Sequence, residues 1–161
     1  MKERLVMKAL FIGRFQPFHL GHLETIRWIC GRVEKLYIVL AEDHEGKDDR
    51  NPYSREQRES MINHSLDDEG IKNYDIVYIP DFETVDGWYN AIVRYVPDFD
   101  TLFTGNPWIE NCFKQRKKNV EHQPDFDSEK YNATKIREKI RKGEPWEHLV
   151  PKSVEKVIKS S

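Results

Sequence analysis

The sequence predicts an α/β fold with a central parallel sheet and helices on both of its faces. Short apolar runs alternate with longer amphipathic stretches along nearly the whole chain, and the run at residues 36–40 is continuously apolar, as in a strand buried on both sides. A length of 161 residues fits one domain, and no repeat, low-complexity tract or Gly/Ser linker divides it. We therefore expect a single domain over residues 1–161.

The N-terminal part of the chain predicts a strand, a helix and a second strand. Residues 9–12 are four consecutive apolar residues, and Gly13 ends them. Residues 22–33 place their apolar side chains at near-helical spacing. The second strand follows at residues 36–40. Strand, helix and strand in this order form a βαβ unit, which pairs its strands in parallel.

The next helix and strand are marked by capping and by proline. Ser54 is a good helix N-cap, and Gln57 three residues later completes a capping-box pattern, so that we expect a helix running toward Leu66. Residues 75–79 form the third predicted strand, which Pro80 ends.

The C-terminal half continues the alternation. Residues 86–96 predict a helix bounded by Pro97, and residues 101–104 predict the fourth strand. A Gly-Asn-Pro turn and a helix through Phe113 follow. The remaining chain predicts a loop at 123–130, a helix at 133–142 and an amphipathic helix from Ser153.

Composition excludes several classes of protein. The chain is 38% hydrophobic and 34% charged, and its net charge of −2 disfavours nucleic-acid binding, which needs a basic face. Cys30 and Cys112 have no further Cys or His at ligand spacing, so that neither a disulfide framework nor a zinc site is indicated. No apolar run is long enough to cross a bilayer and the first residues lack a signal-peptide core, which predicts a cytoplasmic protein without membrane contact.

The segment at residues 13–22 is the strongest candidate for a phosphate site. It reads Gly-Arg-Phe-Gln-Pro-Phe-His-Leu-Gly-His, lies directly after a predicted strand and opens a helix, whose free N–H groups suit phosphate. Arg14, His19 and His22 add donors for phosphate oxygens. The pattern is neither a Walker A loop nor a dinucleotide fingerprint. Two other interpretations stay open: the histidines are ordinary turn and cap residues, or they share a metal ion.

This segment resembles the G-x-F-x-P-x-H-x-G-H signature of the adenylyltransferase and cytidylyltransferase superfamily. The Gly-Arg-Phe-Gln-Pro-Phe-His run is most similar to the archaeal type of nicotinamide mononucleotide (NMN) adenylyltransferase. The resemblance implies a Rossmann-like nucleotidyltransferase fold. The matched positions are Gly13, Phe15, Pro17, His19, Gly21 and His22.

A second segment, at residues 131–137, resembles the superfamily's C-terminal Ser-Ser/x-Thr-x-x-Arg signature. Asn132 and Ala133 stand where serines are usual, while Thr134 and Arg137 match and share one side of a helix turn. Asn132 is a suitable N-cap for that helix. The resemblance implies that Thr134 and Arg137 contact the β- and γ-phosphates of ATP, Arg137 with its bidentate fork.

Three further stretches extend the resemblance over nearly the whole chain. Residues 50–54 and Arg58 resemble a segment in which an arginine approaches the polyphosphate, and residues 104–107 resemble a turn that backs the adenosine and acceptor sites. Asp81 and Trp88 resemble an NMN pocket in which an indole stacks on nicotinamide. Residues 83–87 depart from the Asn-rich stretch usual there, and Trp88 as an ordinary core residue is the alternative.

The resemblance implies the reaction of ATP with NMN to give NAD and pyrophosphate, with no covalent enzyme intermediate. It assigns catalysis to Arg14, His19, His22 and Arg137, and it predicts Mg²⁺ as cofactor, held mainly by substrate phosphates rather than by protein ligands. A homo-oligomer is implied as well. The residues expected to bind ATP are Gly13, Phe15, His19, Gly21, His22, Arg50, Gly105, Asn132, Thr134, Ile136 and Arg137. Those expected to bind the acceptor are Arg14, Phe18, Asp81, Trp88 and Asn106.

Two alternative functions stay open at this point. A sibling transferase would use another acceptor, such as FMN, phosphopantetheine or a substrate of a cytidylyl pathway. A catalytically idle nucleotide-binding module is the other. A tRNA-charging relative is disfavoured, because the chain is short and lacks a Lys-Met-Ser-Lys-type loop.

Overall fold

The computed structural model describes residues 7–42, 49–80 and 84–161, and they belong to two compact units. Unit 1 comprises Met1–Gly13, Trp28–Glu42 and Asn73–Gln123. Unit 2 comprises Arg14–Arg27, Asp43–Lys72 and Pro124–Ser161. Each unit is described separately below, and the expectation of a single domain stays a prediction.

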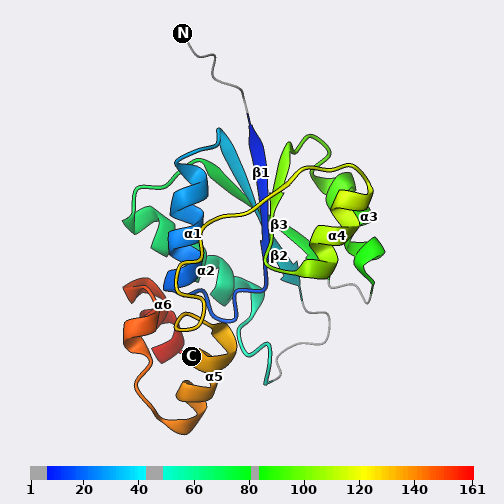
Figure 1. Ribbon diagram of the computed structural model, residues 1–161. Coiled ribbons are helices and arrows are strands. Elements are labelled where there is room, and N and C mark those ends of the chain that lie inside the picture. The colour runs from blue at the N-terminus through cyan, green and yellow to red at the C-terminus, as the bar shows by residue number, and fades with distance from the viewer. Residues whose placement is uncertain (1–6, 43–48, 81–83) are drawn as a thin grey trace. The chain divides into compact units, whose positions relative to one another are not determined.

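Strands and helices alternate along the chain as predicted (Figure 1). The elements are β1 (Lys8–Gly13), α1 (Leu20–Cys30), β2 (Lys35–Glu42), α2 (Arg55–Asp68), β3 (Tyr74–Pro80), α3 (Val85–Tyr95), β4 (Thr101–Phe103), α4 (Pro107–Gln115), β5 (Val120–Glu121), α5 (Ala133–Lys142), the 3-10 helix η1 (Glu147–Leu149) and α6 (Lys152–Lys159).

Unit 1 contains a parallel sheet in the order β3-β2-β1-β4-β5. Every paired strand is parallel, with Leu10 of β1 opposite both Tyr37 of β2 and Leu102 of β4. The predicted parallel sheet is therefore confirmed. The strand order reverses between β1 and β4, and in open α/β sheets ligands bind beyond the carboxyl ends of the strands at such a point.

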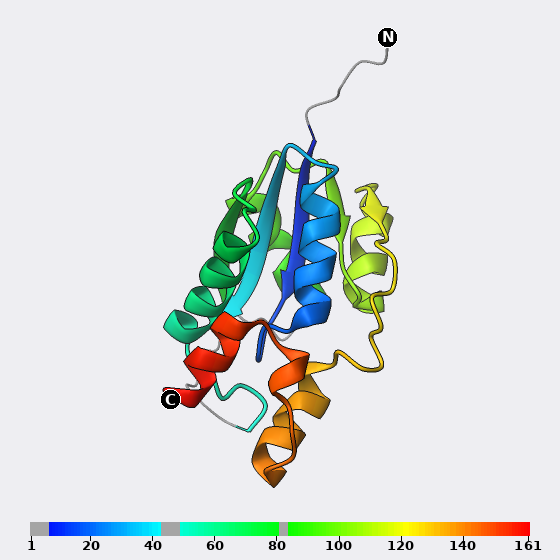
Figure 2. The same cartoon turned by 90° about the vertical axis from the view of Figure 1, so that its left-hand side faces the viewer.

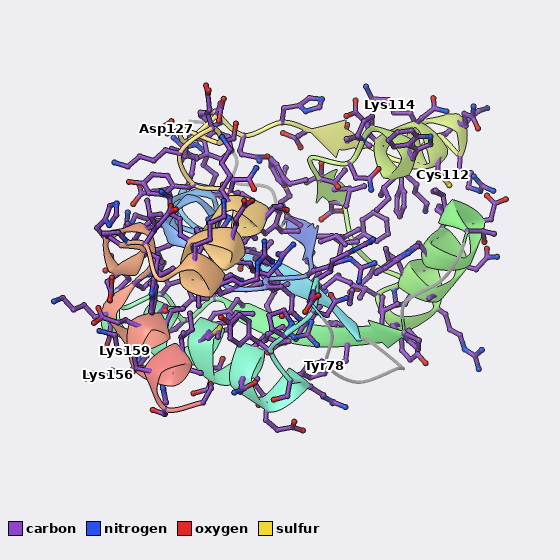
Figure 3. All side chains as sticks on the ribbon, turned by 90° about the horizontal axis from the view of Figure 1, so that it is seen from below. Tyr78, Cys112, Lys114, Asp127, Lys156 and Lys159 are labelled. Atoms are coloured by element: carbon purple, nitrogen blue, oxygen red, sulfur yellow. The ribbon has the colours of Figure 1, made fainter. Side chains whose placement is uncertain are left out.

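Helices cover both faces of this sheet. On one face α3 and α4 pack on Leu10 and Leu102 (Figure 1). Side chains alternate along a strand, so that Phe103 points to the opposite face, where its ring meets Trp28 of α1 edge-on with centroids 6.1 Å apart. Cys112, on α4 in Figure 3, belongs to the α3–α4 core. It is a buried, free thiol there.

Unit 2 consists of residues 20–27 of α1 together with α2, α5 and α6. The predicted capping box of α2 is confirmed: Gln57 N–H donates to Ser54 Oγ at 3.1 Å, and Ser54 N–H donates to Gln57 Oε1 at 2.8 Å. The α6 helix packs along α2 (Figure 2), where Ser153 Oγ donates to Asp68 Oδ2 at 2.7 Å. Lys156 lies on the outer side of α6 in Figure 3.

Three features differ from the sequence-based prediction. The helix expected at 22–33 runs from Leu20 to Cys30, because Gly31 follows and the N–H groups of the next two residues close a turn on Ile29 O. The strand β5 was not expected, since two residues are too few to show a period of two. The short helix η1 was also missed. Within the described ranges, no helix has the length and apolarity needed to cross a membrane.

Candidate active site

The loop that follows β1 is fastened to the segment before α2 by one buried side chain. Gln16 is 2% exposed, and its Nε2 donates to Tyr53 O at 3.0 Å while its Oε1 accepts Tyr53 N–H at 2.9 Å. The side-chain amide of Gln16 thus pairs with both the N–H and the C=O of Tyr53, as a residue of a neighbouring strand would. Both buried backbone groups of Tyr53 are satisfied, and the loop cannot shift without breaking two hydrogen bonds.

Two guanidinium groups hold the backbone of the same loop. Arg58 Nη1 donates to Arg14 O at 3.0 Å, and Arg137 Nη1 donates to Gln16 O at 2.8 Å. Phe15, between these two carbonyls, has a φ of 54° in the left-handed region that non-glycine residues rarely adopt. Such a conformation persists only where its surroundings determine it, and here the bonds on either side do so.

The two imidazoles of the loop bond reciprocally to each other's backbone. His19 N–H donates to His22 Nδ1 at 3.1 Å, and His22 N–H donates to His19 Nδ1 at 3.3 Å. The rings are stacked with centroids 3.6 Å apart, and the Phe18 ring stacks on His22 at 5.6 Å. The α1 helix therefore begins with both rings fixed in orientation.

This geometry decides the protonation of both histidines. Each Nδ1 accepts a hydrogen bond, so that the proton of the neutral ring is on Nε2, which is a donor. Burial lowers the pKa of His19 to about 4. Burial, and secondly the neighbouring His19, hold the pKa of His22 well below its usual value. Near neutral pH the pair therefore offers two uncharged N–H donors.

Gly21 is required by the packing of the histidine pair. A Cβ at Gly21 would lie 3.0 Å from His19 Cε1 and 3.0 Å from Tyr131 Cβ. The glycine thus lets the His19 ring and the segment before α5 approach the same point of the backbone.

The loop, the segment before α2 and the start of α5 enclose a cavity of about 490 Å³ in unit 2. Three arginines face it, and none of the described residues that line it is acidic, so that it is suited to a polyanion. Its lining residues are Arg14, Phe15, Gln16, His22, Arg50, Asn51, Ala133, Thr134 and Arg137.

The predicted phosphate-binding segment at 131–137 contributes the α5 end of this cavity. Asn132 caps α5 as expected, because its Oδ1 accepts Lys135 N–H at 3.2 Å. Thr134 and Arg137 share one side of the first turn, with Arg137 Nη2 at 3.3 Å from Thr134 Oγ1. Ile136 is fully buried and is not among the described residues that line the cavity.

The residues predicted around the acceptor are less accessible. Phe18 is fully buried, and its ring stacks on the ring of His22. Trp88 is 8% exposed and packs in the core of unit 1, which favours the alternative that it is a core residue. Asp81 lies outside the described residues.

The turn after β4 has the expected form. Asn106 caps α4, with its Oδ1 accepting Trp108 N–H at 2.9 Å and Ile109 N–H at 3.2 Å. Gly105 beside it is exposed, and nothing lies within 4 Å of where its Cβ would stand. Gly13 ends β1, opposite Leu40 of β2. Gly13, Gly105 and Asn106 belong to unit 1.

The structure also tests whether the histidines share a metal. In the part of the chain that the structure describes, no group of three or more His, Cys, Asp or Glu side chains could hold an ion. Both Nδ1 atoms already accept N–H groups, which removes them as ligands.

Known proteins are similar in sequence to this chain over nearly its whole length. Residues 10–139 match the family described as cytidylyltransferase-like. Nicotinamide-nucleotide adenylyltransferase 1 of Sulfolobus acidocaldarius is 38% identical over 95% of this chain and 89% of its own length. The nicotinamide-nucleotide adenylyltransferase of Ignicoccus hospitalis is 39% identical over 95% of this chain and 91% of its own. The chain belongs to the nicotinamide-nucleotide adenylyltransferase family.

A solved structure supports the fold of this adenylyltransferase. The bifunctional NMN adenylyltransferase/ADP ribose pyrophosphatase of Francisella tularensis, in complex with AMP and a manganese ion, superimposes with a TM-score of 0.78 at 22% identity. The match covers 97% of this chain and 49% of that one, so that the adenylyltransferase described here spans about half its length. The predicted Rossmann-like nucleotidyltransferase fold is thereby confirmed.

Two residues that organise the adenylyltransferase site were not predicted for it. Gln16 was noted only within the run that resembles the archaeal type, and Arg58 only as part of a similar segment. The structure shows that both hold the loop through hydrogen bonds, Gln16 to the backbone of Tyr53 and Arg58 to the carbonyl of Arg14. One sequence feature could have indicated the structural role of Gln16. It is a long polar side chain between aromatic residues, in the run Phe-Gln-Pro-Phe.

Proposed function

We propose that the cavity of unit 2 binds the triphosphate of ATP, and that the chain transfers the adenylyl group to NMN, forming NAD and pyrophosphate. The acceptor NMN is the one named for the curated relatives, and it is preferred here over FMN, phosphopantetheine and cytidylyl acceptors. The observation that carries the proposal is the convergence of Arg14, Arg50 and Arg137 with the His22 ring on one cavity, whose lining among residues 7–42, 49–80 and 84–161 has no acidic side chain.

The reaction needs no protein nucleophile. An oxygen of the NMN phosphate attacks the α-phosphorus of ATP, a new P–O bond forms, and the bond from the α-phosphorus to the α–β bridging oxygen breaks with release of pyrophosphate. Catalysis of such a transfer rests on positioning two polyanions and on stabilising the charge of the transferring group.

The histidine pair is suited to the α-phosphate. Its Nε2–H groups are neutral donors, so that they hydrogen bond to phosphate oxygens without adding a mobile proton near the reacting atoms. Arg14 is assigned to the polyphosphate and the acceptor phosphate, and Arg50, Thr134 and Arg137 to the departing pyrophosphate.

The remaining assignments concern residues beyond the phosphate donors. In unit 2, Phe15 lines the proposed ATP cavity, Gly21 makes room for the His19 ring, and Asn132 caps α5. The ATP contacts of Gly13, Gly105 and Ile136 stay predictions. The acceptor contacts expected of Phe18, Asp81, Trp88 and Asn106 stay predictions. Mg²⁺ is the proposed divalent ion, held by substrate oxygens, where it neutralises phosphate charge. A homo-oligomer and a cytoplasmic location stay predictions.

The test is a direct assay of the full chain with ATP, Mg²⁺ and a panel of acceptors: NMN, nicotinic acid mononucleotide, FMN and phosphopantetheine. NAD is measured by enzymatic reduction to NADH, and pyrophosphate is measured in parallel. Turnover with NMN but not with FMN or phosphopantetheine is expected, and pyrophosphate without NAD would point to another acceptor. Absence of turnover with every acceptor would indicate the idle nucleotide-binding module.

A matched pair of variants locates the site. Arg137→Met should lower kcat/KM for ATP by about 100-fold, as does loss of a donor to the charge that develops on the departing pyrophosphate in the transition state. Arg141→Met, at an exposed position of the same helix, is the control and should change it less than twofold. Equal effects of the two variants would contradict the placement of ATP at α5.

A further inference from the structure

Arg58 is a buried charged residue that lines no part of the ATP cavity. Its side chain is 2% exposed, and it lies in the first turn of α2. Burying a guanidinium is costly unless its donors are satisfied. The hydrogen bonds that Arg58 donates therefore indicate its role in the protein.

Two of its donor atoms are directed at backbone carbonyls in two segments. Arg58 Nε donates to Ser54 O at 3.3 Å, and the backbone N–H of Arg58 donates to the same oxygen at 3.0 Å. The side chain is thereby fixed to the N-cap of its own helix. From there its Nη1 reaches Arg14 O at 3.0 Å.

The held carbonyl is the one before the strained residue of the loop. Phe15 has its φ of 54° directly after Arg14, and Gln16 on the other side is held by Tyr53 and by Arg137. The Arg14 side chain lines the cavity. Arg58 of α2 thus holds the backbone of Arg14, while the Arg14 guanidinium faces the space proposed for the phosphates.

We propose that Arg58 is a positioning residue for adenylyl transfer, which acts on the substrates through Arg14 by holding the Arg14 carbonyl. This inference rests on the proposed function. A rigid support of this kind places a donor where phosphate charge develops, and a small displacement of such a donor costs much of its effect. A purely structural role would instead stabilise the fold without any specific link to Arg14.

The experiment is a double-mutant cycle with Arg14→Met, Arg58→Met and the double variant. Kinetic constants for ATP and NMN are measured, together with ATP binding by calorimetry. Arg58→Met should lower kcat/KM for ATP by about 30-fold, the effect of one charge-assisted hydrogen bond. Since Arg58 acts through Arg14, the double variant should be no more than about threefold worse than Arg14→Met alone.

Two further variants separate folding from positioning. Arg58→Lys keeps the charge but offers one compact donor group for two carbonyls, and should be intermediate between wild type and Arg58→Met. It replaces Arg58→Met in the cycle if that variant does not fold by circular dichroism. Arg55→Met, on the exposed side of the same helix, is the matched control and should match wild type.

The outcomes are distinguishable from a failure of the proposed function. If wild type neither binds ATP nor forms NAD, the proposed function itself is wrong. If wild type is active, either of two results overturns the inference: kinetic constants of folded Arg58→Met within twofold of wild type, or losses in the double variant equal to the product of the single losses.

Discussion

His19 and His22 each accept the backbone N–H of the other at Nδ1, and their stacked rings have centroids 3.6 Å apart. This reciprocal pairing links local sequence spacing to chemistry. Two residues three apart at a helix start satisfy two of the backbone N–H groups that a helix leaves unpaired. Because each Nδ1 accepts one of these bonds, the ring proton of each neutral imidazole is on Nε2.

The first prediction concerns stability against pH. The pKa of His19 is about 4 in the folded protein and about 6.5 in the unfolded chain. Between these values the unfolded chain binds more protons, so that the free energy of unfolding is unchanged above pH 6.5 and falls by roughly 3 kcal/mol toward pH 4. Urea denaturation at pH 7 and pH 4.5 measures this. His19→Gln should reduce the pH dependence, and an unchanged dependence in that variant would exclude His19 as its source.

A second prediction separates turnover from binding at the same residue. His19→Ala should lower kcat by about 100-fold, because it removes a donor to the transferring phosphate, while the affinity for ATP should change by less than about fivefold. Steady-state kinetics and calorimetry measure the two quantities. An unchanged kcat would remove His19 from the mechanism.

Gly21→Ala tests the packing beneath the histidine pair. Its Cβ would meet His19 Cε1 and Tyr131 Cβ at 3.0 Å, so that the ring must move. We expect a loss of about 1–3 kcal/mol in stability and a kcat at least about tenfold lower. Thermal melting of Gly105→Ala is the control, because nothing lies within 4 Å of its added carbon. Wild-type kcat in Gly21→Ala would show that the pair tolerates displacement.

Gln16→Leu tests the attachment of the loop to residue 53. The change leaves the buried N–H and C=O of Tyr53 without their partners, which should lower the free energy of unfolding by about 3 kcal/mol. Urea denaturation measures it, with Gln115→Leu at an exposed site expected within about 0.5 kcal/mol of wild type. A loss below about 1 kcal/mol would mean that water replaces the side chain.

The metal requirement should follow the substrate rather than the protein. We expect chelation with EDTA to abolish activity, and the Mg²⁺ concentration giving half-maximal rate to rise with ATP concentration. Titrations of Mg²⁺ at three ATP concentrations check this, with Mn²⁺ as a second ion. A half-maximal concentration independent of ATP would indicate a resident protein site.

Much of the fold follows from local patterns. The apolar runs at β1 and β2, the capping box at Ser54 and the Asn132 cap of α5 depend on neighbours within four residues, and the structure confirms them. The two-residue strand β5 could not be predicted, because it exists only through its pairing with β4.

The candidate site, like the fold, was predictable from the sequence only in part. The residue types and spacing at 13–22 and 131–137 identify donors for phosphate, and the adenylyltransferase resemblance that they carry is confirmed by the family comparison. Burial is decided by the tertiary structure: Phe18 and Trp88, whose acceptor contacts stay predictions, are both buried, because exposure depends on which segments cover a side chain.

The sequence by itself determined the alternation of strands and helices. It also contained the loop that we predict to bind phosphate and the second motif with Thr134 and Arg137, since each depends on short-range spacing. Only the tertiary structure decided how that loop is held. Gln16 and Tyr53 are 37 residues apart, Arg14 and Arg58 are 44 apart, and Gln16 and Arg137 are 121 apart. Hydrogen bonds require atoms within about 3 Å, and no local pattern specifies which distant segments the fold brings to that distance.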